Sequence, residues 1–203
     1  GFTTAAVTAS VNRLAADGRT DSVAVSCELE VTEGAQTFVR SMSVEGNVSM
    51  PEAFLESEFN AAIGRRYFSS DIEASQTLIL ARYLNEGYEQ ASVSVERRFD
   101  DSLNFVDVVF RVHEGVQVLV DHILIIGNQR VSSQAIRRET TLRIGRPLGL
   151  DDVAETRRRL NALGMFRRVD IREFSHGRTD RRDVIIEVEE APATILSYGG
   201  GLE

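Results

Sequence analysis

Hydrophobic and polar positions change their period along the chain, and these changes predict the elements of a small module. Residues 37–44 alternate as a short strand and lead into the turn pair Gly46-Asn47. Two apolar patterns at helical spacing follow, and two alternating stretches, residues 91–99 and 105–112, close the module as strands. The predicted order is therefore strand, helix, helix, strand, strand.

The two helical patterns carry their own start and stop signals. Residues 49–52 and 70–73 both have the form Ser-x-x-Glu, which is typical of a capping box at a helix N-terminus. Because glycine commonly follows the last helical residue, we expect the first helix to end at Gly64 and the second at Gly87. The sequence therefore predicts a helix pair between the first strand and the closing strands.

The same order of elements recurs about 80 residues later. Gly46-Asn47 recurs as Gly127-Asn128, 81 residues downstream, whereas Gly87-Tyr88 recurs as Gly164-Met165 after 77 residues. The four residues that are lost correspond to about one turn of an α-helix. We therefore predict that the second helix of the later copy is one turn shorter.

The repeat divides the chain into modules. Residues 37–117 form one complete copy and residues 118–190 form the next. Residues 1–36 correspond to the closing part of a truncated copy, of which only the hairpin is expected. Residues 191–203 follow the last copy as a linker and the start of a further strand.

Composition and side-chain chemistry point away from catalysis. The 203 residues are 42% hydrophobic and 27% charged, which is typical of a chain that folds around a core. The single cysteine, Cys27, excludes an internal disulfide, and its place in an alternating apolar stretch predicts a thiol that faces the core. His113, His122 and His176 are scattered among charged and turn positions, so we predict no metal site. No catalytic constellation is present, and we expect neither an enzyme nor a bound cofactor.

Four features of the repeat together resemble the POTRA domains of outer-membrane assembly and translocation proteins of the BamA and TamA type. They are a Gly-Asn turn after the first strand, an Ile-Gly pair between the helices, a Gly-Met-Phe sequence after the second helix and a closing Val-x-Glu. In the last copy these features are Gly127-Asn128, Ile144-Gly145, Gly164-Met165-Phe166 and the stretch 184–189.

The resemblance implies an α+β fold and a cellular setting. Each module is expected to be a β-α-α-β-β unit, with a three-stranded mixed sheet covered on one face by two helices. The resemblance also implies a location in the periplasm, as the soluble part of an outer-membrane protein. Residues 191–203 are then expected to lead into the first strand of a membrane β-barrel.

The resemblance further implies that the first strand of each closing hairpin lies at a sheet edge and captures extended client segments. Val93→Pro is expected to remove a backbone donor and to weaken client binding while the core stays folded. The candidate partner-binding residues are Ser92, Val93, Ser94, Val95 and Glu96 at one edge, and Arg168, Val169, Asp170, Ile171 and Arg172 at the other.

Charge is distributed unevenly along the chain. Residues 1–117 hold nine Arg and 18 acidic residues, whereas residues 118–190 hold 14 Arg and 12 acidic residues. The arginines of residues 118–190 are expected either to face a membrane or the barrel or to form a solvated charged surface. The overall charge of −8 disfavours nucleic acid as a partner. The candidate basic residues are Arg157, Arg158, Arg167, Arg181 and Arg182.

Three functional hypotheses follow. The first is the periplasmic region of a barrel assembly factor that binds unfolded outer-membrane proteins, together with accessory periplasmic proteins or lipoproteins. The second keeps the fold but assigns it to a two-partner secretion transporter or another translocation pore with a dedicated secreted substrate. The third, a scaffold that binds RNA, is disfavoured by the acidic charge and the lack of exposed aromatic stacking residues.

Overall fold

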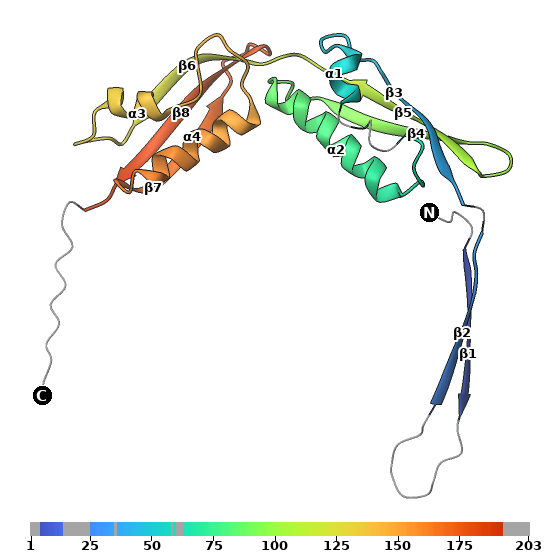
Figure 1. Cartoon of the computed structure of the whole chain (residues 1–203). Coiled ribbons are helices and arrows are strands. Elements are labelled where there is room, and N and C mark those ends of the chain that lie inside the picture. The colour runs from blue at the N-terminus through green and yellow to red at the C-terminus, as the bar shows by residue number, and fades with distance from the viewer. Residues whose placement is uncertain (1–4, 14–24, 35, 58, 60–62, 193–203) are drawn as a thin grey trace, which may run out of the picture. The chain divides into compact units, whose positions relative to one another are not determined.

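The computed structural model describes residues 5–13, 25–34, 36–57, 59 and 63–192 (Figure 1). The chain divides into two compact units, Gly1–Leu78 with Val93–Val112 and Ile79–Ser92 with His113–Glu203. The further strand expected to begin after the last module falls on residues 193–203, which lie outside the described residues. Of the helices that the structure describes, none has both the length and the apolar character needed to cross a membrane.

The N-terminal hairpin pairs β1 (Ala6–Arg13) with β2 (Val25–Thr32) in an antiparallel two-stranded sheet. Every residue of β2 is exposed, and Leu29 keeps 63% of its surface accessible. Cys27 is exposed as well, so the prediction of a buried thiol is wrong. The reason is that no helix of the described residues packs on this hairpin, and a sheet face without a second layer cannot bury its side chains.

The first module (residues 37–117) contains the sheet β3-β5-β4, in which β3 (Phe38–Glu45) runs parallel to the central strand β5 (Phe105–His113). The third strand, β4 (Ser92–Phe99), lies at the other edge. Helix α2 (Ser69–Asn85) lies along one face of the sheet (Figure 1). The core contains the fully buried side chains of Leu55, Ile72, Val106 and Phe110.

The start of helix α1 (Glu52–Glu56) differs from the prediction. Pro51 is the N-cap residue and no side chain caps the helix, so the expected capping box does not form. A proline with its fixed φ is suited to the first positions of a helix, and here it leaves Ser49 outside. The end of α1 differs as well, because the helix stops at Glu56 and does not continue to Gly64 as expected. Helix α2 begins at Ser69, one residue before the predicted Ser70, and ends two residues before Gly87 as expected.

The second module (residues 118–190) repeats this architecture. The central strand of its sheet is β8 (Arg181–Glu190), with β6 (Leu119–Ile126) parallel on one side and β7 (Phe166–Phe174) antiparallel on the other. Its helices are α3 (Ser133–Glu139) and α4 (Leu150–Ala162). Helix α4 has 13 residues and α2 has 17, which confirms the predicted loss of one turn. The two modules therefore have the predicted β-α-α-β-β order and mixed three-stranded sheets.

Both Gly-Asn turns need glycine for the same two reasons. Gly46 and Gly127 have φ values of +86° and +85°, a region that disfavours other residues. A Cβ atom on Gly46 would lie 2.3 Å from the carbonyl oxygen of Val112, and one on Gly127 would lie 2.1 Å from that of Val188. The turn after the first strand therefore lies directly against the end of the central strand in each module.

Candidate functional site: the edges of the two sheets

The four outer strands of the two sheets do not present equivalent edges. The start of β3 is already paired with the loop between the helices, since Gly64 N donates to Val39 O at 2.8 Å. The start of β6 is paired in the same way, through Gly145 N and Val120 O at 2.7 Å. Strands β4 and β7 lie at the opposite edges, beside the central strands only. The structure thus places both predicted partner-binding segments at sheet edges.

Strand β7 has one apolar and one polar face. Val169 and Ile171 point into the core and are 9% and 7% exposed, while the alternate residues Arg168, Asp170 and Arg172 lie on the other face. The five candidate residues of this edge therefore alternate between an apolar buried face and a polar face. Because Val169 and Ile171 are buried, β7 cannot slip by one residue along β8. The backbone N–H and C=O groups that an added strand would contact are therefore held in fixed positions.

The polar face of β7 carries cross-strand ion pairs. Arg172 pairs with Glu187 of β8, and Arg167 pairs with Glu189. The carboxylate of Asp170 lies 3.8 Å from the guanidinium of Arg172. An open hollow of about 610 Å³ extends over this face and is lined by Gly127, Gln129, Arg130, Arg168, Asp170, Arg172 and residues 187–190. The edge of β7 is therefore flanked by a polar surface.

Glu190 fixes one border of this hollow. Its carboxylate accepts hydrogen bonds from the backbone N–H groups of Gln129, Arg130 and Val131 at 2.8 to 2.9 Å. The Arg130 side chain adds a bond at 2.9 Å. These bonds, that from Val131 first, lower the pKa of Glu190 to about 2. These hydrogen bonds join the end of β8 to the turn after β6.

Strand β4 is less open than β7. Ser92 and Ser94 are exposed, but Val93 is only 8% exposed and its carbonyl oxygen accepts a hydrogen bond of 2.6 Å from Gln76 Nε2 of α2. Glu96 bonds Arg98 at 2.7 Å, and this bond is the main reason that its pKa is lowered. One backbone acceptor of this edge thus already has a partner. Because Val93 is buried, Val93→Pro would also disturb the core, contrary to the expectation that the core stays folded.

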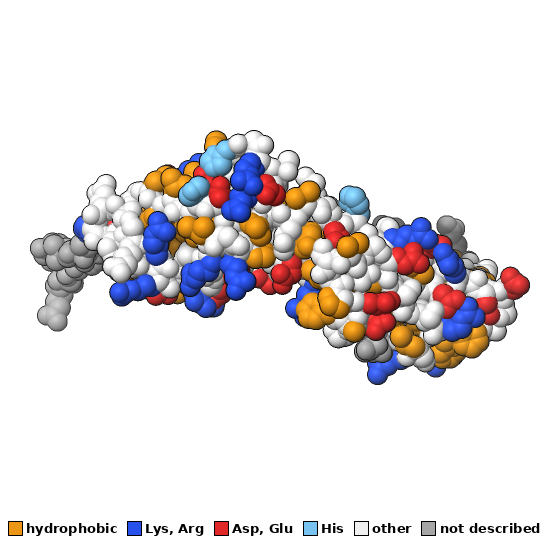
Figure 2. Space-filling model, turned by 90° about the horizontal axis from the view of Figure 1, so that it is seen from above, with side chains coloured by type: hydrophobic (Ala, Val, Ile, Leu, Met, Phe, Trp, Pro, Cys, Tyr) orange, Lys and Arg blue, Asp and Glu red, His pale blue; other side chains and the backbone are white. Residues whose placement is uncertain are grey.

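The candidate basic residues of α4 are only partly engaged. Arg158 bonds Glu155 through two nitrogens at 2.7 Å, and Arg159 bonds the same carboxylate at 2.6 Å. The bond from Arg158 is the largest cause that lowers the pKa of Glu155 to about 2. Arg157 is exposed. Figure 2 shows basic side chains interspersed with acidic ones on the face in view.

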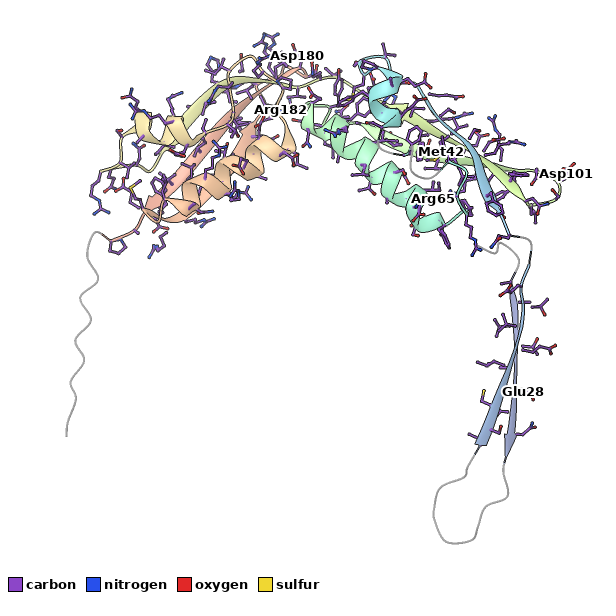
Figure 3. The ribbon with its side chains drawn as sticks, in the orientation of Figure 1. Glu28, Met42, Arg65, Asp101, Asp180 and Arg182 are labelled. Atoms are coloured by element: carbon purple, nitrogen blue, oxygen red, sulfur yellow. The ribbon has the colours of Figure 1, made fainter. Side chains whose placement is uncertain are left out.

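The basic residues of β8 are held inside the second compact unit. Arg181 Nη1 bonds Asp121 at 3.1 Å, and Arg182 Nη2 bonds Glu89 at 3.3 Å while its side chain is only 18% exposed. Arg182 is labelled in Figure 3, at the start of β8 near Asp180. These residues are not brought together into one free basic patch, and their contact with a membrane or barrel stays a prediction.

One cluster was missed by reasoning from the sequence. His122 Nδ1 lies 3.0 Å from Asp183 Oδ1, and His176 Nε2 contacts the other carboxylate oxygen of Asp183. The sequence separates these residues, but the fold brings them together. An alignment of the two copies could have indicated this contact. It places His122 and Asp183 at the positions of Ser41 and Asp107, and these two residues are in contact in the first module.

Comparison with known proteins gives one family. The POTRA model, described as "Surface antigen variable number repeat", matches residues 37–115 and again residues 118–191. Each match contains one β-α-α-β-β unit, and together the two matches cover more than half of the chain.

Relatives and solved structures agree with this match. "Outer membrane protein assembly factor BamA" of Neisseria meningitidis is 24% identical over 183 residues, which are 89% of this chain but only 23% of that relative. The crystal structure of Haemophilus influenzae BamA POTRA3-5 has a TM-score of 0.59 and 26% identity, and covers 94% of this chain and 74% of that one. BamA from Haemophilus ducreyi lacking POTRA domains 1-3 shows the same fold, with a TM-score of 0.60, 20% identity, and coverage of 77% of this chain and 29% of that one.

Proposed function

Because two successive POTRA matches cover most of its length, this chain belongs to the POTRA family, and on that premise we propose that it is the client-binding region of an outer-membrane protein assembly factor. The region works in the periplasm and binds extended segments of unfolded outer-membrane proteins by strand addition. Its similarity to BamA supports the assembly role. The attached barrel and the accessory proteins belong to the same proposal.

The observation that carries the proposal is the asymmetry of the sheet edges. The outer strands β3 and β6 are paired at their starts with the interhelix loops, whereas β4 and β7 lie at the opposite edges of their sheets. An unpaired edge offers backbone N–H and C=O groups to an extended chain. Recognition through the main chain tolerates many client sequences, as an assembly factor requires.

Strand β7 is the better of the two docking edges. Its buried Val169 and Ile171 hold the strand in register, and its other face joins the polar hollow beside Asp170. In β4 the carbonyl of Val93 is bonded to Gln76. We therefore place the main client contact at Arg168–Arg172 and a weaker one at Ser92–Glu96.

The test uses a synthetic peptide of roughly ten residues that alternates apolar and polar side chains like a barrel strand. Amide hydrogen exchange, followed residue by residue by NMR, is measured with and without the peptide. We expect the amides of β7 that point away from β8 to exchange more slowly when the peptide is bound. The amides of the central strands serve as the internal control.

Backbone methylation of the peptide supplies the decisive control. Successive N–H groups of a strand point to opposite sides, so methylation of every second nitrogen blocks pairing in one register and spares it in the other. Strand addition predicts that one of the two methylated peptides binds like the unmodified peptide and the other does not. Equal binding of both would show that side chains, not the backbone, recognise the client.

A further inference from the structure

Two histidines and one aspartate from three segments of the second module meet at one end of its sheet. His122 belongs to β6, Asp183 to β8, and His176 to the connection between β7 and β8. Their ligand atoms all lie within 4.8 Å of one another. Figure 2 shows histidine side chains beside acidic ones on the face in view.

A β-bulge produces this meeting. The parallel register of β6 and β8 passes from Val120 opposite Arg182 to Ile123 opposite Val184. Two residues of β6, one of them His122, therefore stand opposite Asp183 alone. The backbone thus sets the imidazole of His122 against the carboxylate.

The three side chains combine a sheltered carboxylate with accessible imidazoles. The Asp183 side chain is only 10% exposed, whereas those of His122 and His176 are 66% and 46% exposed. The ring of Phe174 stands edge-on to that of His176, with their centroids 5.6 Å apart, and so orients the imidazole. An ion can reach the cluster from solvent without opening the core.

The charges around the cluster favour an ionised carboxylate. Burial of Asp183 acts to raise its pKa, but the hydrogen bond from His122 and the charges of His176 and His122 outweigh it and lower the pKa overall. Asp121 adds a second carboxylate 3.7 Å from His122 Nδ1 and is itself held by Arg181 at 3.1 Å.

We propose that His122, His176 and Asp183 bind a divalent transition-metal ion of the Zn²⁺ type, with a fourth coordination position open to water. Two imidazole nitrogens and one carboxylate oxygen form a donor set that suits this ion. Ligand atoms of a tetrahedral zinc ion are about 3.3 Å apart, so the exposed rings must move by about 1 Å from their present positions. Binding of the ion replaces the direct contacts that the imidazoles now make with Asp183.

The first module provides a built-in comparison. Its β3 strand has the equivalent bulge, between Val39 and Ser41, opposite Asp107. There Asp107 is held by Arg40 and Ser41. A guanidinium stays protonated and does not ligate metal ions, so this position cannot bind a cation. Metal binding is therefore assigned to the second module alone.

Calorimetric titration of the tag-free 203-residue chain with ZnCl₂ tests the proposal. We expect one zinc ion per chain, and the variants His122→Ala and His176→Ala should each bind at least about tenfold more weakly. The matched control is His113→Ala, which removes the third histidine of the sequence and should leave the affinity unchanged. Zinc should also raise the thermal unfolding midpoint of the wild type and of His113→Ala. It should not raise that of the double variant, which combines His122→Ala with His176→Ala.

Circular dichroism of each variant confirms that the fold is intact, and the exposed positions of both histidines make this the expected result. Absence of zinc binding by the folded wild type at millimolar concentration would overturn the proposal and leave an ion-paired cluster only. Zinc binding that survives in the folded double variant would overturn it equally, because the ion would then be held elsewhere.

Discussion

At the bulge of its first strand, the first module holds Asp107 with the guanidinium of Arg40, whereas the second module holds the equivalent Asp183 with two imidazoles. The backbone is the same in both modules: one extra residue in the outer strand faces one aspartate in the central strand. What differs is the chemistry of the partner. The guanidinium beside Asp107 is always positively charged and therefore excludes a metal ion. The imidazoles beside Asp183 can be neutral and can ligate one.

The comparison separates the features that both modules share from the side chains that differ between them. The glycine turn, the buried alternate residues and the loop that pairs with the outer strand recur in both copies. The side chains at the bulge project from the sheet edge and can change without altering the core. Three sets of variants test this division between the shared backbone and the differing side chains.

The largest effect is expected from the shared glycine turn. Gly127→Ala places a Cβ atom 2.1 Å from the backbone oxygen of Val188 and also forces a strained φ, so it should destabilise the second module by about 3 kcal/mol. Gly46→Ala should do the same to the first module. Denaturant unfolding followed by hydrogen exchange of the central strands reports each module separately.

Gly145→Ala is the matched control for the glycine turn. Gly145 has a φ of +78° but nothing within 4 Å of its added Cβ atom, so only conformational strain of about 1–2 kcal/mol is expected. Equal losses in Gly127→Ala and Gly145→Ala would contradict the close approach of the turn to Val188 as the reason for glycine.

A smaller effect is expected in acid. The pKa of Asp107 is lowered from 3.8 to about 2, mainly by its bond to Arg40, and that of Glu190 from 4.5 to about 2, mainly by the backbone bond from Val131. Both carboxyls have a lower pKa in the folded state than in the unfolded one. Their contribution to stability is therefore present above about pH 4.5 and is lost as the pH falls towards 2.

The two carboxyls belong to different modules, so their variants should separate the acid responses. Asp107→Asn is expected to flatten the pH dependence of stability between pH 4.5 and 2 in the first module only, and Glu190→Gln in the second only. Hydrogen exchange across this range measures both modules in one sample. A change in both modules from either single variant would contradict the assignment.

The smallest effect concerns the difference between the docking edges. Gln76→Ala frees the carbonyl of Val93 and should cost about 1 kcal/mol of stability, while the client peptide gains contact at β4. Gln117→Ala removes a similar bond, from Gln117 Nε2 to Glu86 O at 2.9 Å, away from both edges. It should reduce stability without changing peptide protection at β4. If Gln76→Ala left that protection unchanged as well, Gln76 would not limit this edge.

Most of the fold was predictable because it rests on local signals that occur twice. The glycine turns, the end of the second helix and the alternating strands each appear in two copies, and the 77-residue offset predicted the shorter α4. Local signals failed where a neighbour or a missing layer decided the outcome. Pro51 displaced the expected cap of α1, and Cys27 is exposed because no described helix covers its hairpin.

The candidate sites were predictable only in part. The resemblance to the family implied that β4 and β7 are edge strands, and both lie at the edges of their sheets, although client binding there stays a prediction. The bond from Gln76 to β4 and the cluster around Asp183 depend on contacts between residues 17 and 61 positions apart. Hydrophobic periodicity carries no information about such contacts, since it reports only which face of an element is buried.

The pairing of β3 and β6 with the interhelix loops has a consequence for self-association. A sheet with two open edges can add copies on both sides and grow into a fibre. Here one side of each sheet is occupied at its start by the module's own loop. Edge-to-edge pairing of two copies of one module would therefore leave no open edge at the start of the joined sheet, so each sheet can accept one strand partner without extending further.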